Sequence, residues 1–119
     1  MTVRFDNQVA IVTGAGNGLG RSHALALAAR GAKVVVNDFG GSRDGTGGST
    51  AAADAVVQQI KDSGGEAIAN PANVADINQV KAMVEQTMET WGRVDVLINN
   101  AGILPVSYTH LTLPTKRIV

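Results

Sequence analysis

Short apolar runs alternate along the chain with longer segments in which apolar residues recur every three or four positions. The short runs are rich in Val, Ile and Ala and do not alternate regularly with polar residues, which is typical of strands buried on both faces of a parallel sheet. Four strands are predicted on this basis, of which the third is the weakest, over residues 9–13, 33–37, 66–70 and 94–98.

The segments between these runs have the pattern of helices. In the last segment the apolar residues are spaced by three and four positions and share one helix face: Ile77, Val80, Val84, Met88 and Trp91. Glycines follow all three segments, and glycine often ends a helix. The predicted helices run over residues 19–30, from Ser49 as N-cap to Ser63, and over 76–91.

The order of elements is therefore β-α-β-α-β-α-β. Strands and helices that alternate in this way, joined by right-handed crossovers, form an α/β fold with a doubly wound parallel sheet. The scarcity of aromatic residues, 3% of the chain, agrees with a core built from Ala, Val, Ile and Leu.

Composition narrows the function classes. The 119 residues suffice for one domain, and ten basic against ten acidic residues argue against a nucleic-acid or anionic-membrane surface as partner. There is no cysteine, which excludes thiolate metal sites and cysteine nucleophiles, and no metal site is predicted. No apolar run approaches the roughly 18 residues of a membrane span, and the start has no apolar core of a signal peptide. We therefore expect a cytoplasmic protein.

A glycine-rich loop lies between the first predicted strand and the first predicted helix. It fits the pattern T-G-x-x-x-G-x-G through Thr13, Gly14, Gly18 and Gly20, and it fits neither G-x-G-x-x-G nor a P-loop. Free N–H groups at a helix N-terminus suit a pyrophosphate, and glycines let the backbone approach it. The alternative is a glycine-rich turn that binds no ligand.

Asp38 favours the phosphate-binding interpretation. It follows the second strand, eighteen positions after Gly20, near the offset of about 20 residues at which an acid accepts the ribose hydroxyls of NAD. A 2′-phosphate would meet this carboxylate unfavourably, so NAD is favoured over NADP, although Arg43 in the following loop offers a basic group. The alternative is that Asp38 is an ordinary turn residue.

These motifs, with Asn73–Val74 and the Asn-Asn-Ala-Gly segment at 99–102, resemble the N-terminal half of the short-chain dehydrogenase/reductase family. The resemblance covers residues 3 to about 104 and implies a Rossmann-type domain, here a partial one over 1–104. In that family an Asp-Val pair contacts the adenine, and Asn73 replaces the Asp here. The cofactor-binding residues implied by the motifs are Thr13, Gly14, Asn17, Gly18, Leu19, Gly20, Asp38, Asn73, Val74, Asn99, Asn100, Ala101 and Gly102.

Residues 35–41 and 47–53 resemble the (3R)-hydroxyacyl-CoA dehydrogenases of that family. The resemblance implies an NAD-dependent oxidoreductase that moves hydride between nicotinamide and a secondary alcohol or ketone, such as a 3-hydroxyacyl thioester, in a parent protein that forms homo-oligomers. Two alternatives remain: a dinucleotide-binding sensor without catalysis, and a structural fragment that does not bind NAD.

No catalytic residue is assigned in this chain. The family's chemistry needs a Ser and a Tyr-x-x-x-Lys pair beyond the fourth strand, where the Tyr moves the substrate proton and the Lys lowers its pKa. Tyr108 is followed four positions on by Thr112 instead of Lys, and neither His23 nor His110 suits the role of a base.

The segment after Pro105 looks foreign to the domain. Residues 106–119 resemble the translation of a sequencing-library adapter, so 105–119 are predicted to be a non-native tail; the alternative is a natural short isoform. We expect this tail not to cover the edge of the fourth strand, and therefore expect the chain alone to fold poorly and to be inactive.

Overall fold

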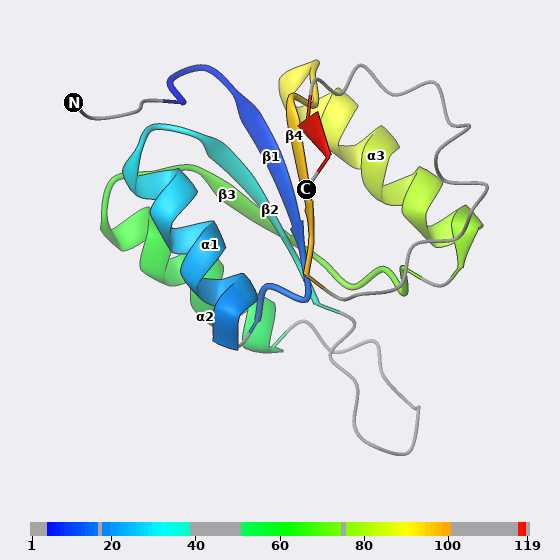
Figure 1. The fold of residues 1–119 in the computed structure, drawn as a ribbon, viewed down its shortest axis with the longest axis horizontal. Helices are drawn as coiled ribbons and strands as arrows, with labels where there is room; N and C mark the ends of the chain where they lie inside the picture. Colours follow the sequence, from blue (N-terminus) through cyan, green and yellow to red (C-terminus); the bar gives the residue numbers. More distant parts are fainter. Residues whose placement is uncertain (1–4, 17, 39–50, 75, 101–116, 119) are drawn as a thin grey trace.

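A computed structural model describes residues 5–16, 18–38, 51–74, 76–100 and 117–118 of the chain. Its centre is a parallel sheet of five strands in the order β3-β2-β1-β4-β5 (Figure 1). The strands are β1 Val9–Thr13, β2 Lys33–Asn37, β3 Ala67–Asn70, β4 Val96–Asn99 and β5 Arg117–Ile118. The four predicted strands are confirmed, the first two with the predicted bounds.

Three helices connect the first four strands: α1 Gly18–Ala29, α2 Ala51–Asp62 and α3 Ile77–Trp91. The ends of α3 follow from its sequence. Asp76 is the N-cap, and its carboxylate accepts the N–H of Asn78 at 2.9 Å. Gly92 ends the helix in the left-handed region with φ 77°, and its N–H donates to the Met88 carbonyl. The N-cap predicted for α2, Ser49, lies outside the described residues.

The helices form a layer on each side of the sheet, with α1 and α2 on one face and α3 on the other (Figure 1). Successive residues of β1 face opposite layers: Ala10 and Val12 pack with the α1 and α2 side chains, whereas Ile11 packs with Val80 and Met83 of α3. Because every residue of β1 is buried, the strand shows no apolar–polar alternation. The predicted α/β class with a doubly wound parallel sheet is confirmed.

The fourth strand begins two residues later than predicted. Before it, Asp95 bonds to β1 through its side chain. Asp95 is 2% exposed, and its carboxylate accepts the N–H of Val9 at 2.9 Å. The same carboxylate accepts two bonds from the Arg93 guanidinium, at 2.6 and 2.7 Å. The Asp95 N–H in turn donates to the Val9 carbonyl at 2.9 Å. Asp95 thus ties the start of β4 to the start of β1.

The outer edge of β4 was expected to be left uncovered by the tail. Arg117–Ile118 pairs with β4 in parallel, with Val96 opposite Arg117 and Leu97 opposite Ile118, so the prediction that this edge stays bare is wrong at these two positions. The physical reason is that strand pairing uses backbone N–H and C=O groups, which any non-proline residue offers. The foreign origin of the tail stays a prediction.

Candidate cofactor-binding site

The strand order places a switch point at the centre of the sheet. From β1 the chain moves outward through β2 and β3, and it then returns to place β4 on the other side of β1. In sheets of this kind the ligand crevice lies outside the carboxyl ends of the strands on either side of such a point. Thr13 and Asn99 end β1 and β4, and Asp38 directly follows β2, so these predicted residues gather at this edge.

The glycine loop leads directly from β1 into α1. Gly14 and Gly18 adopt left-handed backbone angles, with φ 61° and 58°, which favour glycine. Gly20 is needed for a close approach, because a Cβ there would overlap the Gly14 carbonyl oxygen and lie 2.7 Å from Asn100 Nδ2. The loop therefore folds tightly over the first turn of α1. Asn17, predicted as a ligand, lies outside the described residues.

The first turn of α1 is open to solvent. Gly18 is exposed, and a Cβ at this position would meet no atom within 4 Å. Leu19 is 65% exposed, and among the described residues no other large apolar side chain is exposed. An exposed leucine at the N-terminal end of a helix places an apolar contact next to the N–H groups that can bind an anion.

The end of β4 holds the loop in position. The Thr13 hydroxyl is 3.0 Å from Asn99 Oδ1 and donates to it, and Asn100 Nδ2 donates to the Gly14 carbonyl at 3.3 Å. Thr13 is 1% exposed, so its side chain acts inside the protein, between the strands. Three of the predicted residues thus position the backbone of the glycine loop. Ala101 and Gly102 lie outside the described residues.

Asp38 stands beside the loop, half-buried at the end of β2. Its N–H donates to the Asn70 carbonyl at 3.1 Å, and the Ala15 N–H donates to the Asn37 carbonyl at 2.7 Å. The first bond fixes Asp38 against the end of β3, and the second fixes the glycine loop against the end of β2. The carboxylate and the loop therefore share one rigid edge.

Asn37 is a site residue that the sequence interpretation missed. It is 1% exposed, and its Nδ2 donates to the carbonyls of Asn70 and Ala72, at 3.2 and 3.0 Å. These bonds hold the segment after β3 close to the end of β2. The sequence did hold a signal for this role: Asn37 is a polar residue at the end of a strand of valines. A buried polar side chain in such a place needs hydrogen-bond partners.

Val74 and Asn73, the two residues predicted to contact the adenine, differ in their surroundings. The Val74 side chain is buried in the cluster beneath α3, so it packs in the core. Asn73 is partly exposed; its N–H donates to Gln79 Oε1 at 2.8 Å, and its carbonyl accepts the Asp76 N–H at 2.9 Å. The helix start thus fixes the Asn73 backbone.

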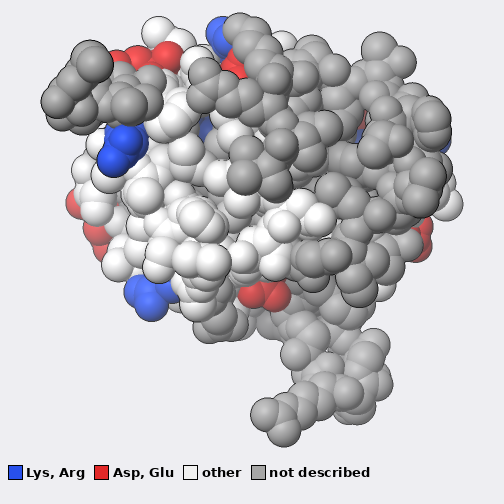
Figure 2. Space-filling model, in the orientation of Figure 1, with Lys and Arg blue, Asp and Glu red and all other residues white. Residues whose placement is uncertain are grey.

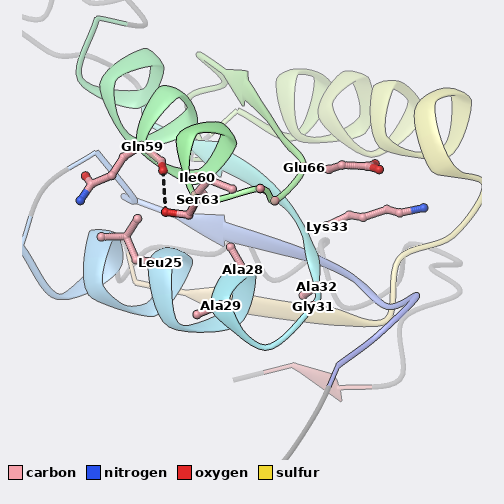
Figure 3. A pocket seen from close by; sticks show the side chains of 12 residues that line it. Leu25, Ala28, Ala29, Gly31, Ala32, Lys33, Gln59, Ile60, Ser63 and Glu66 are labelled. Carbon is pink, nitrogen blue, oxygen red and sulfur yellow. Dashed lines mark hydrogen bonds between the residues drawn. The ribbon is translucent and has the colours of Figure 1, made fainter.

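A cavity of about 450 Å³ lies at the other end of the molecule (Figure 3). It lies where α1 and α2 end and β2 begins, and its lining includes the small residues Ala28, Gly31 and Gly64. It includes none of the predicted cofactor residues, so it is separate from the crevice at the carboxyl ends of the strands.

Charge and metal chemistry add little to this picture. On the face seen in Figure 2, basic and acidic side chains of the described residues lie scattered. Within the described ranges, His, Asp and Glu form no group of three that could hold a metal ion, and no helix is long and apolar enough to cross a membrane. The pKa of Arg93 is raised by its hydrogen bonds and charge pairing with Asp95, so the guanidinium stays charged at any working pH.

Comparison with known proteins decides the family. The short chain dehydrogenase family matches residues 8–117, which is most of the chain. The chain belongs to this family. The resemblance found in the sequence motifs is confirmed. The chain is 55% identical over 102 residues to the peroxisomal multifunctional enzyme type 2 of Drosophila melanogaster, covering 86% of this chain and 17% of that protein.

Solved structures agree with the fold. A short chain dehydrogenase from Mycobacterium avium superposes with a TM-score of 0.74 at 53% identity, over 84% of this chain and 35% of that one. A 7α-hydroxysteroid dehydrogenase, solved in complex with NADH and 7-oxo glycochenodeoxycholic acid, has a TM-score of 0.71 at 34% identity, over 81% of this chain and 34% of that one. The chain thus spans about a third or less of the length of these relatives.

Proposed function

We propose that this chain is the cofactor-binding half of an NAD-dependent oxidoreductase that moves hydride between nicotinamide and a secondary alcohol or ketone. The observation that carries the proposal is the rigid edge shared by the glycine loop and Asp38 at the switch point of the sheet. The residues present there suit a dinucleotide: an open helix N-terminus at Gly18, an exposed Leu19 and a carboxylate beside them.

Each of these groups has a definite task toward the cofactor. The N–H groups of the first turn of α1 would bind the pyrophosphate, since the helix end carries partial positive charge. The Asp38 carboxylate would accept the adenosine ribose hydroxyls, and it would repel the 2′-phosphate of NADP. Asn73 would lie at the adenine. The NADH in the 7α-hydroxysteroid dehydrogenase supports the choice of a nicotinamide dinucleotide.

The bound nicotinamide supplies the hydride acceptor, and the protein must move the substrate proton. The sequence has one tyrosine, Tyr108, and Thr112 stands where the family's lysine would follow it. We therefore assign no catalytic residue here and propose that the chain alone is inactive. A 3-hydroxyacyl thioester is the proposed substrate, on the strength of the resemblance at 35–41 and 47–53. The cytoplasmic location and the homo-oligomer stay predictions; the name of the Drosophila relative states a peroxisomal location.

The test is the cofactor preference of the complete protein, meaning an uninterrupted gene product with this N-terminal half. Asp38→Ala removes a charge-assisted acceptor, which should reduce the kcat/KM for NAD relative to NADP by about ten- to over a hundredfold, or roughly 1.5–3 kcal/mol. Kinetics with a 3-hydroxyacyl-CoA and each cofactor measure the ratio.

The matched control is Asp62→Ala, which removes the same charge from an exposed position in the last turn of α2. It should leave the ratio unchanged. A complete protein that binds NAD but oxidises no 3-hydroxyacyl-CoA or other secondary alcohol would favour the sensor instead. A preference that Asp38→Ala does not move would refute the role of Asp38.

A further inference from the structure

Gly16 is a glycine whose backbone does not require one. The described glycines with left-handed φ include Gly14 and Gly18 on either side of it, but Gly16 is not among them. An alanine could therefore adopt its backbone angles without strain. The reason for a glycine must lie in what surrounds the position.

The surroundings of Gly16 are the Asp38 carboxylate and the first turn of α2. A Cβ built on Gly16 would overlap Asp38 Oδ2, lie 2.8 Å from Asp38 Cγ and lie 2.9 Å from Ala52 Cβ. Real Cβ atoms essentially never come within 3.0 Å of such neighbours. The carboxylate thus occupies the space that a side chain at Gly16 would fill.

The backbone cannot easily relieve such an overlap. The hydrogen bond from Ala15 N–H to the Asn37 carbonyl, at 2.7 Å, fixes the loop one residue before Gly16 and one residue before Asp38. Ala15 is fully buried, and the Asp38 N–H is bonded to the Asn70 carbonyl. Because both backbones are fixed, the group that can move is the Asp38 side chain, by rotation away from the loop.

We propose that Gly16 is a positioning residue for Asp38: its missing side chain lets the carboxylate lie against the glycine loop, and this placement contributes to the preference for NAD over NADP. The proposal rests on the proposed function, in which Asp38 accepts the ribose hydroxyls. It adds a second determinant of cofactor choice, one that acts through Asp38 and need not touch the cofactor.

The experiment is a double-mutant cycle in the complete protein with Gly16→Ala, Asp38→Ala and both changes together. Gly16→Ala should reduce the kcat/KM ratio of NAD to NADP by about tenfold, as expected when one charge-assisted hydrogen bond is misplaced. In the Asp38→Ala background the same change should alter the ratio less than about twofold, since the group through which Gly16 acts is gone.

Gly65→Ala is the matched control. A Cβ there would lie 2.8 Å from Ile60 Cγ2, closer than real Cβ atoms come, at the opposite end of the sheet and also without left-handed φ. It should lower the midpoint of thermal unfolding and leave the cofactor ratio unchanged. This control separates crowding in general from crowding of Asp38.

Each result of this double-mutant cycle supports or overturns the role of Gly16. The proposal is overturned if Gly16→Ala reduces the kcat/KM for NAD and for NADP equally, or if it shifts their ratio as much in the Asp38→Ala background as in the parent. In either case the proposed function still stands, provided that Asp38→Ala shifts the ratio. If Asp38→Ala itself leaves the ratio unchanged, both fall. Should Gly16→Ala fail to fold, recovery of folding in the double variant supports the overlap with Asp38, whereas continued failure assigns the requirement to Ala52 and overturns the proposal.

Discussion

The Asp95 carboxylate offers a stability prediction that can be worked from the structure. Asp95→Ala removes the acceptor of the Val9 N–H, which lies at 2.9 Å and belongs to a residue that is 1% exposed. An unsatisfied buried N–H costs about 1–3 kcal/mol, and a hydrogen bond to a charged group contributes about 1.5–3 kcal/mol. Because these figures describe the same interaction, we expect a loss of about 2–3 kcal/mol in the free energy of unfolding.

The ion pair with Arg93 should contribute less to this loss. The Arg93 side chain is 42% exposed, so water solvates the guanidinium whether or not Asp95 is present. Arg93→Ala keeps the hydrogen bond from the Val9 N–H to the Asp95 carboxylate, so it is expected to destabilise the protein clearly less than Asp95→Ala. Asp95→Asn keeps an oxygen for the Val9 N–H and should also cost less than the alanine change.

Urea unfolding of the complete protein and its three variants, followed by circular dichroism, gives the comparison. The linear dependence of the unfolding free energy on urea converts a shift of midpoint into a stability difference when the slope is unchanged. If Asp95→Ala stays within about 0.5 kcal/mol of the parent, the size of ordinary surface changes, the assigned bond contributes little and the reasoning is refuted. If Arg93→Ala costs as much as Asp95→Ala, the ion pair and not the Val9 bond is the stabilising element.

Two further predictions concern the loop and the chain itself. Gly18→Val should raise the Kd for NAD in the complete protein by about tenfold or more, equal to 1.4 kcal/mol, because the valine side chain fills the open space at the helix end. Gly92→Val is the control for backbone strain, since Gly92 has a similar left-handed φ and open surroundings. If calorimetry gives both variants the same affinity for NAD, the phosphate site is refuted. Residues 1–119 expressed alone should show no cooperative thermal melt and no reduction of NAD with a 3-hydroxyacyl-CoA, since among the described residues β5 pairs with β4 at two positions. A cooperative melt with turnover would contradict this.

The sequence predicted best those elements that are buried on both sides. The bounds of β1 and β2 were predicted without error, because a short apolar run has few alternative placements in a parallel sheet. The start of β4 was missed because Asp95 looks like part of an apolar run, whereas its carboxylate bonds the Val9 N–H 86 positions earlier in the chain. A contact of that separation leaves no mark in local periodicity.

The candidate site was predictable in its residue types and less so in their roles. The spacing of the glycines and Asp38 indicated one edge of the sheet, and the structure brings them together there. The spacing could not show that Thr13 and Asn100 hold the loop from inside, that Val74 packs beneath α3, or that Asn37 ties two strand ends together. These roles depend on side-chain directions, which only the assembled sheet determines.

The central claim is that a dinucleotide lies across the carboxyl ends of β1 and β2, with its pyrophosphate on the first turn of α1. The most direct measurement is a crystal structure of the complete protein with NAD. The account predicts the pyrophosphate within hydrogen-bond distance of the N–H groups of Gly18 to Gly20, about 2.7–3.2 Å, and the Asp38 carboxylate on the adenosine ribose hydroxyls. NAD bound elsewhere, such as in the cavity between α1 and α2, or no NAD at saturating concentration, would contradict it.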